Sequence, residues 1–175
     1  MGRSTKTTDF LKECMGDALI KLMKEKPLSK ITAQEITDFA GVGRSTWFRN
    51  FSSKNETLTF YLIAHWKKWI KDHCDEDTPL TTDSAYEFFR FNYSIRDVLD
   101  IIYRNEAQVC IYDAFYAIIM PRFEASLELR YMGKFYAHGL FGLLDEWVKR
   151  DYKETPDDMA ALFKNELAKD FVISL

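Results

Sequence analysis

Apolar residues recur at three- and four-residue spacing along almost the whole chain, and this period restricts the possible folds more than any other feature. Residues 8–26 show it most clearly. One face of a helix over this range would carry Phe10, Leu11, Cys14, Met15, Ala18, Leu19 and Leu22. The 175 residues include only 7 Gly and 4 Pro, which suits long helices better than a turn-rich sheet. The sequence therefore predicts an all-α fold.

The segment ITAQEI, residues 31–36, carries the signals of a helix start. Thr32 and Glu35 have the spacing of a capping box, and the flanking isoleucines have that of a hydrophobic staple. Gly41 suits a left-handed residue just after this short helix. Two further helices are predicted, over residues 44–51 and 53–73. Two short helices around a glycine turn, packed on a longer first helix, form a helix-turn-helix.

The chain is expected to divide into a helix-turn-helix domain, residues 1–54, and a helical domain, residues 55–175. The acidic stretch 75–79 is typical of a loop, and Thr155 followed by Pro156 is typical of a helix start. Helices of the second domain are predicted over residues 82–93, 95–104, 106–120, 124–150 and 157–172.

The net charge of −3 conceals an uneven distribution. Residues 1–71 contain 13 Lys and Arg against 7 Asp and Glu, whereas residues 72–175 contain 11 against 20. A polyanion would therefore be attracted to only one end of the molecule.

Several classes of protein are disfavoured. The chain has no stretch of about 18 apolar residues and starts without the apolar segment of a secretory signal, so we expect a cytoplasmic protein with no membrane partner. Cys14, Cys74 and Cys110 have no metal-binding spacing and are expected to be reduced core thiols. No Glu-x-x-His pair, GxSxG elbow, P-loop or Rossmann glycine pattern occurs, so we expect no enzyme, cofactor or metal site.

Residues 31–58, ITAQEITDFAGVGRSTWFRNFSSKNETL, resemble the DNA-binding signature of the TetR family of transcriptional regulators. That pattern runs approximately T-x-x-x-I-A-x-x-A-G-V-S-x-x-T-[LIF]-Y-x-[HY]-F-x-[SN]-K-[ED]-x-L, and the match has no gap. Residues 136–148, YAHGLFGLLDEWV, are similar to C-terminal domains of Firmicutes members such as dihydroxyacetone-kinase regulators. The resemblance implies a regulator, a repressor by expectation, that binds a palindromic DNA operator as a homodimer and is released by a small effector.

In a helix-turn-helix the second helix enters the major groove with its first residues at the base edges. Arg44 is a candidate for a bidentate contact to guanine, or for a phosphate contact alone. Thr32, Lys54 and the amides that open the third helix suit phosphate. The predicted DNA-binding residues are Thr32, Gln34, Arg44, Ser45, Thr46, Phe48, Arg49, Asn50 and Lys54.

The family's C-terminal helices bind a ligand and dimerise. Aromatic residues are concentrated in residues 60–120, as core or as the lining of a site for an apolar or aromatic effector. The candidate pocket residues are Trp66, Trp69, Phe88, Tyr103, Tyr112, Phe115 and Tyr116. Glycines within residues 124–150 suggest either a dimer seam or close packing inside one chain. The candidate seam residues are Gly139, Gly142, Leu143, Trp147 and Leu162.

The sequence departs from the family pattern at three positions of the helix-turn-helix. Gly43 stands at the usual Ser or Thr, Phe48 replaces a tyrosine that bonds phosphate, and Asn50 replaces His or Tyr. An alternative function is therefore a TetR-like coregulator that acts through protein partners with weak or no DNA binding.

Overall fold

The structure is a computed structural model and describes residues 2–73 and 82–164. Its elements in chain order are α1 (Gly2–Glu25), η1 (Leu28–Lys30), α2 (Ala33–Ala40), α3 (Arg44–Asn50), α4 (Lys54–His73), α5 (Thr82–Ser94), α6 (Arg96–Arg104), α7 (Val109–Ile119), η2 (Met120–Arg122), α8 (Leu127–Lys149) and α9 (Pro156–Leu162). Every regular element in these two ranges is helical, which confirms the all-α prediction.

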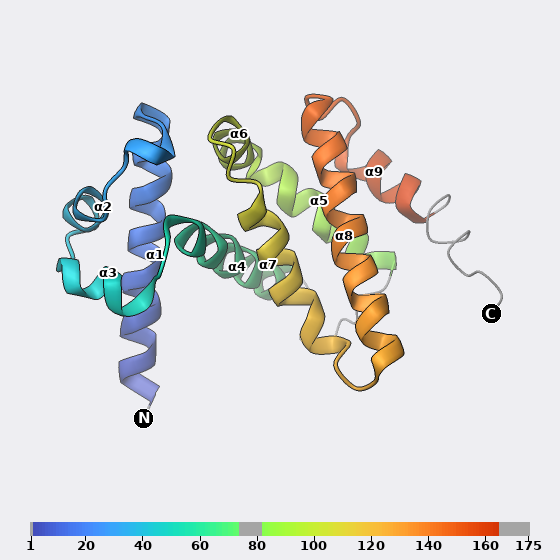
Figure 1. Cartoon of the computed structure of the whole chain (residues 1–175). Coiled ribbons are helices and arrows are strands. Elements are labelled where there is room, and N and C mark those ends of the chain that lie inside the picture. The colour runs from blue at the N-terminus through green and yellow to red at the C-terminus, as the bar shows by residue number, and fades with distance from the viewer. Residues whose placement is uncertain (1, 74–81, 165–175) are drawn as a thin grey trace.

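The first three α-helices form what we call the head, α1–α3. Figure 1 shows α1 beside α2 and α3, with α4 leading away from them. The apolar stripe of α1 is buried here: Met15 and Leu19 are fully covered and share the core with Ile36 of α2 and Leu58 of α4. The burial of this stripe, rather than intrinsic propensity alone, holds α2 and the start of α4 against α1.

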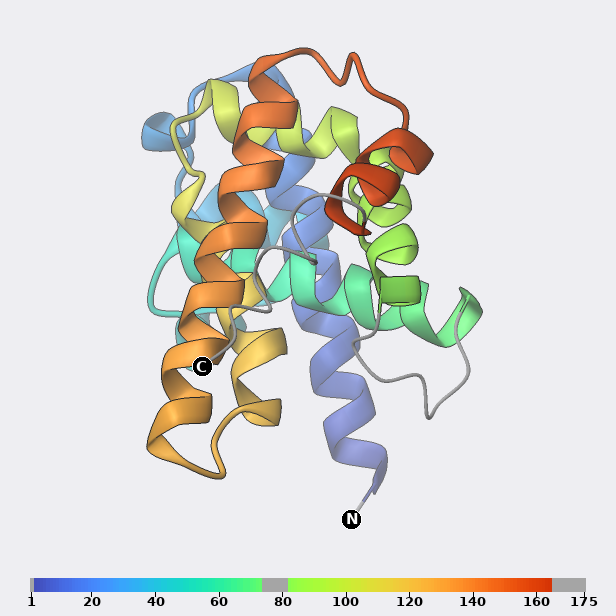
Figure 2. The same cartoon turned by 90° about the vertical axis from the view of Figure 1, so that its right-hand side faces the viewer.

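The remaining helices, α5–α9, form the body. α7 is its central helix, with Cys110, Ile111, Ala114, Phe115 and Ile119 buried along its length. α4 lies against α7 and α8 lies on the other side of α7, while α9 packs on α5. The same arrangement is visible after rotation, where α8 runs along the front of the molecule and α9 lies beside α5 (Figure 2). α4 therefore joins the head to the body.

Several predicted boundaries move for local reasons. α1 begins at Gly2 rather than residue 8, because the apolar stripe from which this helix was predicted starts only at Phe10. α7 begins at Val109 rather than residue 106, since Glu106 has a left-handed backbone with φ of 55°. α8 begins at Leu127 because the Ser126 hydroxyl caps it by accepting from the Leu129 N–H at 3.3 Å. Half of the last predicted helix, residues 165–172, lies outside the described residues.

The described helices were also searched for a membrane span, and none of them is long and apolar enough to cross a bilayer. Within the same residues no group of three or more His, Cys, Asp or Glu side chains could hold a metal ion. Cys110 is a buried free thiol and Cys14 a half-buried one, while Cys74 lies outside the described residues.

Candidate nucleic-acid interface

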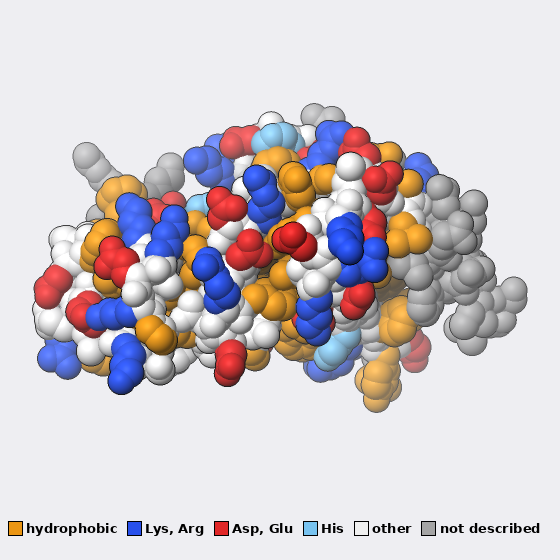
Figure 3. All heavy atoms as spheres, turned by 90° about the horizontal axis from the view of Figure 1, so that it is seen from above, with side chains coloured by type: hydrophobic (Ala, Val, Ile, Leu, Met, Phe, Trp, Pro, Cys, Tyr) orange, Lys and Arg blue, Asp and Glu red, His pale blue; other side chains and the backbone are white. Residues whose placement is uncertain are grey.

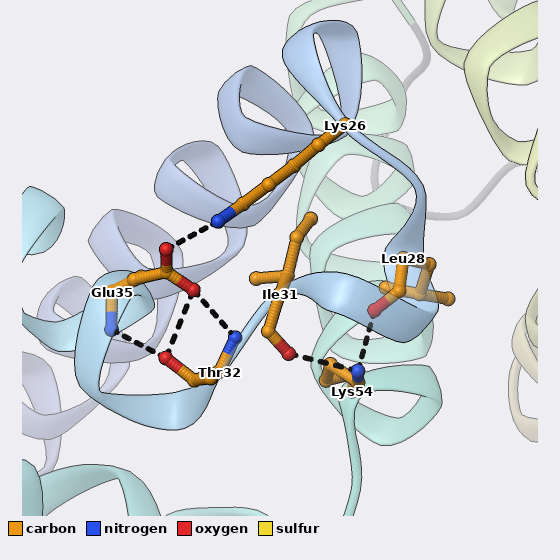
Figure 4. Close-up of polar contacts among 6 residues, drawn as sticks. All are labelled: Lys26, Leu28, Ile31, Thr32, Glu35 and Lys54. Carbon is orange, nitrogen blue, oxygen red and sulfur yellow. Dashed lines mark hydrogen bonds and ion pairs between the residues drawn. The ribbon is translucent and has the colours of Figure 1, made fainter.

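The start of α2 is fixed by the predicted capping box. The Thr32 hydroxyl accepts from the Glu35 N–H at 3.3 Å, and the Glu35 carboxylate accepts from the Thr32 N–H at 2.8 Å. Lys26, just past the end of α1, pairs with the same carboxylate (Figure 4). The Lys26 ammonium and the Thr32 donors together lower the pKa of Glu35 to about 2. The carboxylate therefore stays ionised and ties α2 to α1.

The turn between α2 and α3 uses the one left-handed glycine of the described chain. Gly41 has φ of 66°, and its N–H and that of Val42 donate back to Asp38 and Thr37 of α2. Gly43 then precedes α3, and its carbonyl accepts from the Thr46 N–H at 2.8 Å. Two short helices are thus set at a fixed angle by three residues, as the helix-turn-helix prediction requires.

α3 separates a buried face from an exposed one. Trp47 is buried against the head core, with its ring 6.5 Å from that of Phe51. Arg44, Ser45, Phe48 and Arg49 are exposed, and Phe48 presents 57% of its surface to solvent. The Arg44 guanidinium lies over the Phe48 ring, 5.3 Å from its centroid, which restricts the arginine without covering its donors. The first turn of α3 therefore offers polar donors to a ligand outside the protein.

Two other predicted residues make bonds within their own helices. The Gln34 amide donates to the Asp38 carboxylate at 2.7 Å, along the exposed face of α2. The Asn50 amide donates to the Thr46 carbonyl at 2.7 Å and is half-buried. One amide hydrogen of Asn50 is therefore engaged within α3.

Lys54 differs most from its predicted role. Its ammonium donates to the Leu28 carbonyl and, at 2.9 Å, to the Ile31 carbonyl, so that it points into the head (Figure 4). At the same helix start the Glu56 carboxylate accepts from the N–H and hydroxyl of Ser52, each at 2.6 Å. These Ser52 bonds lower the pKa of Glu56. The start of α4 thus holds a lysine bonded within the protein and an ionised carboxylate.

The charge excess of the N-terminal residues does not form a continuous basic field over the face seen in Figure 3. Lys and Arg side chains alternate there with Asp and Glu, and apolar side chains lie between them. Within the head, Lys26 forms an ion pair with Glu35. Phe39 was not among the predicted residues. It is an exposed ring at the end of α2, with the Lys21 ammonium 5.8 Å from its centroid.

The seven candidate pocket residues fall into three groups. Trp66, Phe88 and Phe115 stack edge to face at the meeting of α4, α5 and α7, and Trp69 donates to Glu87 of α5 at 2.9 Å. Tyr103 of α6 instead donates to Asp145 of α8 at 3.0 Å. Tyr112 and Tyr116 contact each other on another side of α7.

Tyr116 also lines an open surface hollow of about 370 Å³. Its other lining residues are Met120, Glu124 and Arg130. This hollow is more polar than the predicted apolar pocket, and it contains only one of the seven candidate residues.

The five candidate seam residues differ in their exposure to solvent. A Cβ added at Gly139 or Gly142 would meet no described atom within 4 Å, so packing among the described residues does not explain these glycines. Leu162 is 44% exposed and Leu143 half-buried. Trp147 is in the core instead, 1% exposed, with its ring 5.6 Å from that of Phe89 and its indole N–H donating to the Glu154 carbonyl.

Comparison with known proteins places the C-terminal half. No match was found among the curated proteins. Residues 81–169 match a TetR family model described as a transcriptional regulator C-terminal region. That match includes α5–α9 and spans just over half of the 175 residues. The chain, with a helix-turn-helix head and this C-terminal region, belongs to the TetR family of transcriptional regulators.

Proposed function

We propose that this regulator binds a palindromic DNA operator as a homodimer through its two heads. The observation that carries the proposal is the first turn of α3, where Arg44 and Ser45 are exposed while Trp47 anchors the helix in the core. A helix presented in this way can enter a major groove without disturbing the head. Residues 1–71 contain 13 basic against 7 acidic residues, and this positive excess favours DNA binding at the head end of the molecule.

In this proposal Arg44, Ser45 and Thr46 face the base edges, and Arg44 takes a guanine. Its position over the Phe48 ring reduces the freedom that the side chain would lose on binding. Thr32 and Gln34 at the start of α2, with Arg49 and Asn50 at the end of α3, contact the backbone. Phe48 supplies an apolar contact where the family pattern has a tyrosine.

The second head comes from a second copy joined along α8 and α9. Met132, Phe135, Gly139 and Gly142 follow at spacings of three, four and three residues, and all are exposed. Met132 and Phe135 present 43% and 46% of their surface to solvent. A stripe with this spacing is the contact line of paired helices, and its two glycines would admit a close approach.

Release by a small apolar or aromatic effector completes the proposal, in which the protein is a repressor. α4 supports it, because Lys54 at its start is bonded within the head and Trp66 near its end packs on Phe88 of the body. A tilt of α4 would change the separation of the two heads, which must fit half-sites about 34 Å apart. The effector must favour the tilted state, and DNA must weaken effector binding by the same factor.

The experiment is a mobility-shift assay with DNA from upstream of the gene, between low and high salt. The protein should retard a fragment with a pseudo-palindrome, and its affinity should fall steeply with salt. Arg44→Ala should cost about 1–3 kcal/mol of binding and relax the preference at one base pair. Arg122→Ala is the matched control, since Arg122 is also exposed but lies in η2 of the body.

A second candidate function is that of a coregulator that binds another protein and little DNA. The exposed Phe48 favours it, because a phenylalanine cannot make the hydrogen bond that the family tyrosine makes to phosphate. A folded dimer that retards no fragment at low salt would support this second function and contradict the first.

A further inference from the structure

The turn η1, which precedes α2, is held by hydrogen bonds to both the N–H and the carbonyl of Leu28. The Leu28 N–H donates to the Asn105 side-chain oxygen at 2.7 Å. The Leu28 carbonyl accepts from the Lys54 ammonium, which also donates to the Ile31 carbonyl (Figure 4). Asn105 follows α6 in the body, 77 residues away in sequence, and Lys54 begins α4. The turn η1 is therefore attached to the body as well as to α4.

Asn105 is itself firmly placed. Its backbone N–H donates to the carbonyls of Ile101 and Ile102, and its side-chain amide donates to the Ile101 carbonyl at 2.8 Å. The chain then turns back through Glu106, whose φ is 55°, so that the Ala107 N–H donates to the Ile102 carbonyl. The side-chain oxygen of Asn105 is therefore fixed to the end of α6 and moves with that helix.

The position of η1 determines where α2 and α3 lie. Ile31 is buried directly after η1, and Thr32 caps α2. Since α2 and α3 are locked together by the turn at Gly41 and Val42, a displacement of Leu28 is passed to the first residues of α3. A polar backbone group that loses its partner in a partly buried turn is costly, so the turn should follow Asn105 rather than separate from it.

We infer that Asn105 and Lys54 are positioning residues that set the orientation of α2 and α3 relative to the body. This inference rests on the proposed DNA binding. It adds a connection through α6 to the connection through α4, and it gives Lys54 a role inside the protein. Tyr103, in the last turn of α6, donates to Asp145 of α8 at 3.0 Å, so the same connection reaches the helix that carries the proposed dimer seam.

The test compares Asn105→Ala, which removes the acceptor, with Asn105→Asp, which retains an oxygen for the Leu28 N–H. Arg104→Ala is a control in the same turn of α6, because the Arg104 side chain bonds to the Asp100 carbonyl and not to η1. Two properties are measured on the full-length protein: amide exchange and chemical shifts by NMR, and affinity for an operator duplex. The NMR measurement needs no DNA.

Asn105→Ala should speed exchange at the Leu28 amide, shift the amide signals of residues 44–46, and weaken operator binding about threefold to tenfold. Arg104→Ala should resemble the wild type in all three. Asn105→Asp keeps the acceptor for the Leu28 N–H but loses the amide bond to the Ile101 carbonyl, so its effects should lie between those of the wild type and Asn105→Ala. Unchanged α3 signals in Asn105→Ala would overturn the inference whether or not the protein binds DNA. So would operator affinity that is unchanged although the α3 signals move.

Lys54→Met separates positioning from phosphate binding. A lost phosphate contact would lower the salt slope of operator binding by about one, whereas a lost tether should weaken binding with the slope unchanged. A reduced slope would therefore overturn the role given to Lys54. If the wild type retards no duplex while the α3 signals still respond to Asn105, the proposed function fails and the connection through α6 stands.

Discussion

Glu35 is the residue on which the start of α2 depends, and its chemistry follows from two kinds of donor. Lys26 supplies a charge from the end of α1, and Thr32 supplies an N–H and a hydroxyl from the cap. The spacing of Thr32 and Glu35 made the cap predictable from sequence. The pair with Lys26 was not, because it joins residues nine apart across a turn of irregular shape.

The depressed pKa of Glu35 predicts how head stability depends on pH. The pKa of about 2 in the folded protein lies below the ordinary value of 4.5, so the stabilisation is present above about pH 4.5 and is lost as the pH falls towards 2. The difference in unfolding free energy between wild type and Glu35→Gln should be constant at neutral pH and shrink in this acidic window. Urea unfolding from pH 7 to pH 2 measures it.

Lys26→Met is the companion variant for this pH prediction. Because the bond to Lys26 is the largest cause of the shift, the variant should raise the pKa of Glu35 towards its ordinary value. An NMR titration of the Glu35 carboxyl reports this directly. An unchanged pKa would show that the ion pair does not form in solution.

At the level of whole elements, three helices end in the same way, but the left-handed residue was predicted at only one of these ends. After α2, α6 and α8 the chain passes through a left-handed residue, and two N–H groups donate back into the last turn. That residue is Gly41 after α2, but Glu106 after α6 and Asp151 after α8. Glycine announces such an end in a sequence, whereas Glu and Asp do not. The predicted start of α7 was consequently less accurate than the turn between α2 and α3.

The end of α6 predicts a stabilising substitution. Glu106 is exposed and holds φ of 55°, which a residue with a Cβ adopts at a cost. Glu106→Gly should raise the free energy of unfolding by roughly 0.5–1 kcal/mol, after allowance for the greater freedom of glycine in the unfolded chain. Chemical denaturation measures the change.

Gly41→Ala is the reverse change at the equivalent position, the left-handed residue after α2. A Cβ there meets nothing within 4 Å, so only backbone strain is added, and stability should fall by about 1 kcal/mol. Equal stability of Glu106→Gly and wild type would mean that the end of α6 has another conformation in solution.

At the scale of the molecule, the outer face of α8 is an apolar surface that is exposed among the described residues. Six large apolar side chains of its first half are exposed, namely Leu127, Leu129, Tyr131, Met132, Phe135 and Tyr136. The sequence indicated this face through its glycines. It misassigned Trp147, whose neighbours Phe89, Tyr93 and Tyr152 come from other parts of the chain and cannot be seen in the spacing along α8.

The proposed seam predicts opposite effects for two kinds of glycine on α8. Gly139→Leu or Gly142→Leu should leave the single chain folded, because an added Cβ meets no described atom within 4 Å, but should push a partner away and give monomers. In Gly133→Ala the new Cβ would lie 2.7 Å from Phe123, so stability should fall by about 1–3 kcal/mol while the dimer persists. Light scattering with thermal unfolding distinguishes the two. A fully dimeric Gly139→Leu variant would place the seam elsewhere.

The helical class, the head and its exposed helix could all be predicted, because local spacing and capping determine them. The positions of Lys54, Asn105 and the aromatic side chains could not, because their partners lie far away in the sequence. The proposal that the two heads of a dimer bind an operator is tested most directly by selection of duplexes from a random library with the wild-type protein at low salt. We expect enrichment of a two-fold symmetric site whose half-sites are about one helical turn apart, with binding that weakens as salt rises. A folded protein that enriches no sequence would contradict the proposal.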